Sequence, residues 1–220
     1  MGGLLAARLG GAVRVTLLAP TPLGTPLEIR EESDGSLGLW QGGRLRVRAR
    51  REPLELSLPP APDRETTHAQ TGTCRAFLTH PFPGCFVCGP DRAPGDGLRI
   101  FPGPVPGSRA AAAHWTPAPD LASRGAFAPP EIVWAALDSS SAFPLLETPA
   151  SQALEPLVLA GLHAEIREPV VSGQAHLLQM WPLGFEGRRG TAGIALYGPD
   201  DQVRAAGIAQ WVSLAGRAGA

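Results

Sequence analysis

The chain has 220 residues and a net charge of −1, with 19 basic and 20 acidic side chains. Because no basic excess is present to neutralise a phosphate backbone, nucleic acid is not an expected partner. No apolar run reaches the ~18 residues that a membrane span needs, and the opening residues lack the features of a secretory signal, so no membrane association is expected. The three Cys are an odd number, which argues against a disulfide framework and favours the cytoplasm.

The first part of the chain predicts a short helix followed by strands. Residues 2–11 are small and apolar, and residues 13–20 are rich in β-branched and aliphatic side chains. A turn and a second strand follow at 22–33. Residues 36–56 then predict a hairpin that turns at Gln41-Gly42-Gly43, and its second arm alternates in a way that indicates one buried face.

A stretch with little apolar periodicity, residues 58–73, separates this series of elements from the rest of the chain. Its composition predicts a linker. Beyond it we expect short strands at 97–103 and 110–117, and the best helix candidate of the chain at 129–147. Pro129 and Pro130 stand at the entry of this helix, where Pro is tolerated. Four further strands are predicted, at residues 157–170, 176–186, 190–198 and 203–214.

The two series of elements form a weak internal repeat. Residues 13–29 align with 162–178, so that Pro20 falls on Pro169 and Gly24 on Gly173. Element order and turn positions agree, but the first copy lacks the strands that should precede its helix. The repeat predicts two unequal halves: a truncated half at 1–57, a linker at 58–79, a complete domain at 80–214 and a tail at 215–220.

A motif near the start of the second half resembles a known family. The segment His80-Pro81-Phe82-Pro83-Gly84-Cys85-Phe86-Val87-Cys88-Gly89-Pro90, followed by Gly95-Asp96-Gly97-Leu98-Arg99-Ile100, is similar to the start of thioesterase-superfamily hotdog domains, and most similar to acyl-CoA thioesterases of the phenylacetate-pathway type. The resemblance covers about residues 80–214 directly and residues 2–57 only through the repeat. It implies an α+β hotdog fold, in which an antiparallel sheet wraps around a central helix. With the repeat, we expect a tandem hotdog whose N-terminal half is truncated.

The resemblance also implies a site on the central helix. In the family a His-Gly-Gly motif begins this helix and an Asp lies nine residues after the His. Asp138 matches that Asp, whereas Pro129, Pro130 and Glu131 replace His-Gly-Gly. We therefore expect Asp138 to act as base or nucleophile on an acyl thioester, with Glu131, seven residues earlier, on the same helix face. The helix N-terminus near Ile132 and Val133 would supply oxyanion donors.

Further residues are candidates for binding the substrate. Ser139 and Ser141 could position water or the acyl group, and Arg188 or Arg189, in a Gly-flanked loop, could hold the phosphates of CoA. No cofactor is expected besides the CoA thioester as substrate. Because the helix at the start of the chain carries no acid–base side chain, at most one of the two pseudo-sites should be active.

The cysteines allow a metal interpretation. Cys74, His80, Cys85 and Cys88 place four ligand types of zinc within fifteen residues. The alternative is that Cys85 and Cys88 pack as small apolar residues in a turn. A single Cys-x-x-Cys is weak evidence, and we expect no metal.

Three functions follow from these residues. The leading one is a thioesterase-like hydrolase acting on acyl-CoA or another acyl thioester. The second is non-catalytic binding of an acyl ligand, which the missing His-Gly-Gly favours. The third is a structural module, which predicts a closed, apolar interface between the halves at Asp138. The missing first strands also leave a sheet edge through which a homodimer could form.

Overall fold

A computed structural model describes residues 1–121, 125–147 and 156–214, so the predicted tail at 215–220 lies outside the described residues. Within them, ten strands form one antiparallel sheet in the order β2-β3-β4-β1-β7-β10-β9-β8-β6-β5. The strands are β1 (Val13–Leu17), β2 (Glu28–Glu31), β3 (Leu37–Gln41), β4 (Arg44–Arg51), β5 (Gly103–Pro104), β6 (Ala111–Trp115), β7 (Leu157–Ile166), β8 (His176–Glu186), β9 (Arg189–Tyr197) and β10 (Val203–Ser213). The helices are α1 (Gly2–Leu9), α2 (Arg64–Ala69), α3 (Pro130–Ser140) and α4 (Phe143–Leu146), with short 3-10 turns at η1 (Arg75–Phe77) and η2 (Pro119–Leu121).

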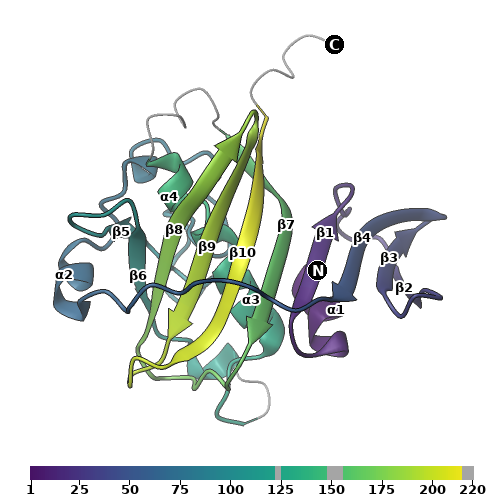
Figure 1. Ribbon diagram of the computed structural model, residues 1–220, viewed down its shortest axis with the longest axis horizontal. Coiled ribbons are helices and arrows are strands. Elements are labelled where there is room, and N and C mark those ends of the chain that lie inside the picture. Colours follow the sequence, from purple (N-terminus) through teal and green to yellow (C-terminus); the bar gives the residue numbers. More distant parts are fainter. Residues whose placement is uncertain (122–124, 148–155, 215–220) are drawn as a thin grey trace.

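The larger half consists of strands β5–β10 and the helices α3 and α4. Helix α3 lies behind strands β7 and β10 in Figure 1 and packs against four of the strands. It buries Val133, Trp134, Ala136 and Leu137 against the inner face of the sheet. A sheet wrapped around a central helix confirms the fold predicted from the sequence.

The smaller half, α1 with β1–β4, repeats the inner part of this arrangement. Outward from the centre the strands run β1-β4-β3-β2 on one side and β7-β10-β9-β8 on the other, and the larger half continues with β6 and β5. The register at the centre is symmetric: Arg14 pairs with His163, Val13 with Ala164 and Val15 with Leu162. The repeat aligns Val13 with Leu162, Arg14 with His163 and Val15 with Ala164, so the strand pairing is the same when the two halves are exchanged. The halves are therefore related by an approximate two-fold axis between Arg14 and His163.

The two helices of the halves cross at very short range. A Cβ on Gly3 would lie 2.7 Å from the Cβ of Trp134 and 3.0 Å from the Cα of Glu131, closer than real Cβ contacts come. Gly3 is therefore the residue that allows α1 to approach α3. The crossing therefore places the start of α1 against the first turns of α3.

Polar contacts tie the halves together on the other face of the sheet. The Arg14 guanidinium donates to the Glu52 carboxylate, with 2.7 Å between Nε and Oε1, and this hydrogen bond lowers the pKa of Glu52 to about 2. Arg14 Nη2 also donates to His163 Nδ1 at 3.1 Å, and His163 Nε2 lies 2.9 Å from the Glu52 carbonyl oxygen. Since the carbonyl only accepts, the His163 proton is on Nε2 and the ring is neutral. His163 thus has a structural role.

The segment predicted as a linker crosses the outer face of the sheet and contains a helix. After β4 the chain runs in front of β10, β9 and β8 (Figure 1), where Leu58 and Ala61 pack on an outer cluster and the Tyr197 hydroxyl donates to the Pro59 carbonyl at 2.5 Å. Helix α2 then begins at Asp63, whose carboxylate accepts from the Thr66 N–H at 2.7 Å. The apolar periodicity did not reveal α2 because the helix buries only Thr67.

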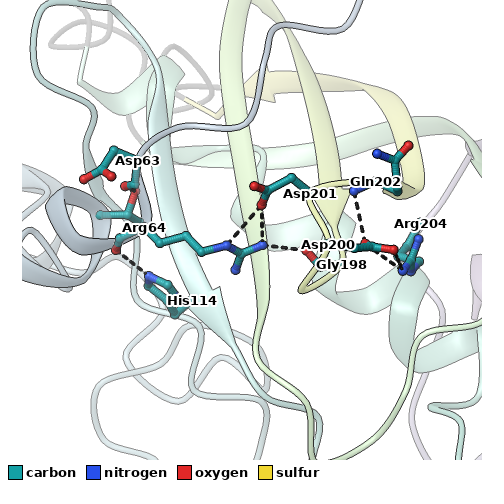
Figure 2. Close-up of polar contacts among 9 residues, drawn as sticks. Asp63, Arg64, His114, Gly198, Asp200, Asp201, Gln202 and Arg204 are labelled. Carbon is teal, nitrogen blue, oxygen red and sulfur yellow. Dashed lines mark hydrogen bonds and ion pairs between the residues drawn. The ribbon is translucent and has the colours of Figure 1, made fainter.

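Hydrogen bonds and an ion pair connect helix α2 to the turn between β9 and β10 (Figure 2). The Arg64 guanidinium donates to Asp201 at 2.7 Å and to the Gly198 carbonyl, while the Arg64 carbonyl meets His114 Nε2 at 2.9 Å. In the same turn Asp200 accepts from Arg204. These contacts fix the start of the second half against its own last hairpin.

Two predicted elements differ from the structure. Residues 98–102 do not join the sheet, because the N–H groups of Leu98 and Ile100 donate to the carbonyls of Phe86 and Val87 instead. The single helix predicted at 129–147 is interrupted after Ser140 and resumes as α4. Ser141 turns its hydroxyl back to the Asp138 carbonyl at 2.6 Å, a bond that competes with regular helix geometry. No helix among the described residues is long and apolar enough to cross a membrane.

Candidate functional site

Asp138 lies in the last turn of α3, where two cavities meet. It lines a cavity of about 660 Å³ between the halves and also a cavity of about 320 Å³ inside the larger half. Both volumes are in the range of small-molecule sites. A partly buried carboxylate shared by two cavities is therefore the centre of the candidate site.

The smaller cavity is an apolar pocket. Its wall comes from the loop at 80–88, from α3 and α4, and from the inner face of β7 and β10. The side chains that define its shape are aromatic and aliphatic: Phe82, Phe143, Leu146, Leu157, Leu159 and Trp211. This surface suits the hydrocarbon or aromatic part of a ligand.

The wider cavity is built by both halves. The first half contributes the start of α1, Val47 and the end of β1 with the residues that follow it, and the second half contributes parts of β7 and β10 together with Arg188. Arg188 lies in the exposed turn between β8 and β9. Its neighbour Arg189 lines a different cavity, of about 640 Å³. Of the two predicted phosphate ligands, the structure brings Arg188 to the cavity of Asp138.

Burial changes the acidity of Asp138. Loss of solvation is the largest cause, and the negative charge of Cys85 adds to it, so that the pKa of Asp138 rises to about 7. Within the described part of the chain, no hydrogen bond to the carboxylate offsets this. A carboxyl group with a pKa near neutrality is half ionised at working pH, which suits a general base.

The N-terminus of α1 faces the same cavity. Met1 and Gly2 line it together with Asp138. Leu4 N–H donates to the Met1 carbonyl at 3.1 Å, and no side chain caps the helix. As in any helix start, the N–H groups of Gly2 and Gly3 have no acceptor within the helix. A Cβ on Gly2 would come within 2.8 Å of Val15 Cγ1, so a glycine is needed to bring this end close to β1.

The predicted oxyanion donors of α3 lie elsewhere. The N–H groups of Ile132 and Val133 both donate to the Pro129 carbonyl, at 2.9 and 3.1 Å. Val133 lines a separate depression of about 400 Å³ together with Pro130 and Ile166. Glu131 is exposed next to Gly3 and lines neither cavity of Asp138. The structure therefore does not bring Glu131, Ile132 or Val133 to Asp138.

The start of α1 is a feature that our sequence reasoning missed. The sequence predicts a short helix at 2–11 that precedes the first series of strands, as the helix at 129–147 precedes the last four strands. That signal was present, but it gave no indication that the glycines of one half face the carboxylate of the other.

The two predicted serines have different surroundings. Ser139 lines the apolar pocket, and its Oγ lies 3.6 Å from Cys85 Sγ. Ser141 is fully buried: it donates to the Asp138 carbonyl and accepts from Trp211 Nε1 at 3.0 Å. Ser139 can touch a ligand, whereas Ser141 supports the helix end.

The four candidate metal ligands separate into a trio and a distant residue. Cys88 Sγ lies 3.5 Å from both Cys85 Sγ and His80 Nε2, whereas Cys74 is buried beside Glu147. His80 Nδ1 accepts the Phe82 N–H at 3.1 Å, so the ring proton is on Nε2 and that nitrogen has no free lone pair for a metal. Among the described residues no group of three His, Cys, Asp or Glu has the arrangement of a metal site.

The fold of the chain is shared with solved hotdog proteins. No protein-family model matches the sequence, and no curated protein matches it. An acyl-CoA thioesterase II from Mycobacterium marinum is 12% identical, with 96% of this chain and 83% of that chain covered and a TM-score of 0.57. A conserved protein of unknown function with a hotdog fold, from Alicyclobacillus acidocaldarius, is 16% identical, with 97% and 86% covered and a TM-score of 0.55.

Both matches run over the two halves. The chain is a tandem hotdog. A thioesterase superfamily protein also matches, with 12% identity and a TM-score of 0.49. The match covers 57% of this chain and only 60% of that protein's length. At such identities the fold is shown, and the site of this tandem hotdog has to be argued from its own residues.

Proposed function

We propose that this tandem hotdog is a thioesterase-like hydrolase that acts on acyl-CoA or a related acyl thioester. The observation that carries the proposal is the position of Asp138 at the junction of an apolar pocket and a wider cavity. A thioester has the same division: an apolar acyl group, a reacting carbonyl and a large polar leaving group. Acyl-CoA thioesterase activity is also the function given for the Mycobacterium marinum protein of the same fold.

In this proposal the acyl group enters the apolar pocket and the CoA part lies in the wider cavity, with a phosphate near Arg188. The carbonyl carbon then lies beside Asp138. Asp138 removes a proton from a water molecule as the water oxygen attacks this carbon. The C–S bond breaks when the tetrahedral intermediate collapses, and the departing thiolate takes up the proton that Asp138 holds.

The negative charge on the carbonyl oxygen needs donors. The N–H group of Gly2, at the positive end of the α1 dipole, is a donor that lines the cavity of Asp138. We propose that the start of α1 replaces the donors we had expected at Ile132 and Val133. Each half then supplies one part of the site: the carboxylate from α3 and the donors from α1.

The alternative functions predict different surroundings for Asp138. A purely structural module predicts a closed apolar interface there, and the two cavities argue against it. An acyl-binding protein without turnover uses the same pocket and is separated from a hydrolase by experiment.

The test is hydrolysis of a panel of acyl-CoA thioesters by wild type, Asp138→Asn and Glu131→Gln. Glu131 is the matched control because it is a carboxylate on the same helix that is exposed and outside both cavities. We expect Asp138→Asn to lose about 100-fold or more in rate and Glu131→Gln to keep the wild-type rate. Binding of an acyl-CoA by calorimetry without hydrolysis by wild type would instead establish the acyl-binding alternative.

The assembly state is a further proposal. Strand β2 is at one edge of the sheet, and we propose that a homodimer forms there, as expected for a half that lacks its outer strands. Light scattering during gel filtration measures the mass directly, and a monomer at high concentration would refute the dimer.

A further inference from the structure

We propose that Cys85 and Cys88 form a peroxide-sensitive dithiol on the wall of the apolar pocket. Both residues line this pocket together with Asp138 and Ser139. Their Sγ atoms are 3.5 Å apart, and a disulfide needs them at about 2 Å. The hydrolysis proposed above makes no use of either thiol.

A chain of hydrogen bonds prepares the two sulfurs for different roles. The His80 Nε2 proton points to Cys88 Sγ at 3.5 Å, the Cys88 thiol donates to Cys85 Sγ, and the Ser139 hydroxyl lies 3.6 Å from Cys85 Sγ. The tautomer of His80 is fixed by the Phe82 N–H on its other nitrogen. Cys85 Sγ thus accepts from the Cys88 thiol and is also hydrogen-bonded to Ser139, and both contacts favour its thiolate.

Acidity follows from this arrangement. The hydrogen bond from Cys88 is the largest cause that lowers the pKa of Cys85, to about 5, whereas the same bond and burial raise the pKa of Cys88 far above its usual range. Cys85 is partly exposed and Cys88 is buried. Thiolate character and access to solvent make a cysteine reactive, so Cys85 is the residue that a peroxide meets first.

The reaction balances with hydrogen peroxide as the oxidant. The Cys85 thiolate attacks one peroxide oxygen, the O–O bond breaks, and Cys85 becomes a sulfenic acid while hydroxide leaves and is protonated to water. Cys88 then gives up its proton and attacks the sulfenic sulfur, which expels the hydroxyl group as a second water. Two thiols are oxidised by two electrons, one peroxide is reduced, and the Cys85–Cys88 disulfide remains.

Disulfide formation changes the site of Asp138. It draws Cys85 Sγ away from Ser139, and it removes the thiolate charge that helps to raise the pKa of Asp138. The groups that face Asp138 are Cys85, Cys88 and His80 from the 80–88 loop, Arg188 from the β8–β9 turn and the amino group of Met1 on α1. Only the charge of Cys85 is lost on oxidation, so the pKa of Asp138 should fall.

Cys74 serves as an internal control. It is buried outside the pocket, and burial raises its pKa well above the usual value. The same protein thus contains a thiol that should stay unreactive under conditions that oxidise the pair.

The experiment treats the reduced full-length protein with a small excess of hydrogen peroxide and follows intact mass and differential alkylation. We expect the loss of two hydrogen atoms, two blocked thiols at Cys85 and Cys88, an alkylatable Cys74 after unfolding, and full reversal by dithiothreitol. Cys88→Ser should stop at a Cys85 sulfenic acid that dimedone traps, and Cys74→Ala should form the disulfide as wild type does. Oxidation of Cys85 to a sulfinic acid in wild type, a disulfide to Cys74, or three unchanged thiols would overturn the proposal, and these readouts on wild type do not depend on the folding of a variant.

A second readout rests on the proposed function. If Asp138 is the base, the acid limb of the pH–rate profile for acyl-CoA hydrolysis should move to lower pH after oxidation. A limb that stays in place while the disulfide is present would refute the coupling to Asp138. If neither form hydrolyses any thioester, the proposed function fails, and the thiol measurements still decide the dithiol.

Discussion

The two halves of this tandem hotdog keep different parts of one site. Helix α3 of the larger half has Asp138 nine residues after its N-cap Pro129, and its first turn begins at Pro130. Helix α1 of the smaller half has Gly10 nine residues after Met1, and its first turn begins with Gly2-Gly3. The larger half thus has the carboxylate, and the smaller half has the glycines at the start of its helix.

The approximate two-fold axis explains why this division still gives a complete site. The start of α1 faces Asp138, so one composite site has both a free helix N-terminus and a carboxylate. Pro130, at the start of α3, has no N–H, and Gly10, after α1, has no side chain. We therefore expect a single site in this chain, and we expect it to depend on both halves. The five predictions below test the site and the contacts between and within the halves.

The largest effect is expected at the helix crossing. Gly3→Ala places a methyl group 2.7 Å from Trp134 Cβ, and we expect the free energy of unfolding to fall by about 1–3 kcal/mol. Hydrolysis should fall as well, because α1 can no longer hold its N-terminus beside Asp138. Gly184→Ala, on β8, is the control, since a Cβ there meets no atom within 4 Å. Denaturant titration measures both variants, and equal stability of the two would show that the halves do not rely on this contact.

Asp138 should make the larger half sensitive to pH. Its folded pKa, about 7, is raised above its ordinary value of 3.8, so the stability that protonation gives is complete below about pH 4 and is lost as pH rises to about 7. Asp138→Asn should therefore stabilise the protein at pH 8 by about 2 kcal/mol more than at pH 4, a figure reduced for the partial exposure of the group. Denaturant unfolding at both pH values measures this difference.

The same titration governs the proposed reaction. Hydrolysis by wild type should rise with pH through about 7, because the base must be ionised. A rate that is constant from pH 5 to pH 8 would contradict the assignment of Asp138 as base. The equivalent position of α1, Gly10, cannot titrate, so one acid limb is expected for the whole chain.

A smaller effect is expected for the two neighbouring arginines. Arg188→Ala should raise KM for acyl-CoA about three- to fivefold, the size of an exposed ion pair, because Arg188 lines the cavity of Asp138. Arg189→Ala is the matched control, since Arg189 lines a different cavity. Steady-state kinetics with acyl-CoA and with the same acyl group on a thiol that lacks phosphates would separate charge from packing. Equal changes in both variants would remove Arg188 from the site.

The smallest effect concerns the ion pair of the smaller half beside His163. Glu52 has a lowered folded pKa, about 2, so its ion pair with Arg14 stabilises the protein above about pH 4.5 and is lost as pH falls toward 2. Glu52→Gln should cost about 0.5–1 kcal/mol at pH 7, because solvent screens the partly exposed pair. At pH 2 the variant and wild type should unfold alike. Exposed Glu55→Gln is the control, and acid titration followed by circular dichroism shows whether Glu52 accounts for the difference.

The sequence by itself determined the strands, the central helix and the unequal repeat. The alternating apolar residues in 44–48 follow from the two-residue period of a sheet with one buried face, and this signal is local. Asp138 was recognisable through the resemblance, which places an acidic residue nine positions after the start of the motif. Helix α2 was missed because it buries little apolar surface. The strand expected at 97–103 was wrong because the backbone of this segment forms its hydrogen bonds with a loop.

Only the tertiary structure decided which groups meet at the site. The start of α1, the turn at Arg188 and the pair Cys85–Cys88 come from three separate regions of the chain and converge on Asp138. Periodicity reports whether a side chain is buried, but it does not report which helix end faces it across a two-fold axis. The close approach at Gly3 sets how the halves pack: without a Cβ at this position, α1 can lie directly against Glu131 and Trp134 of the other half.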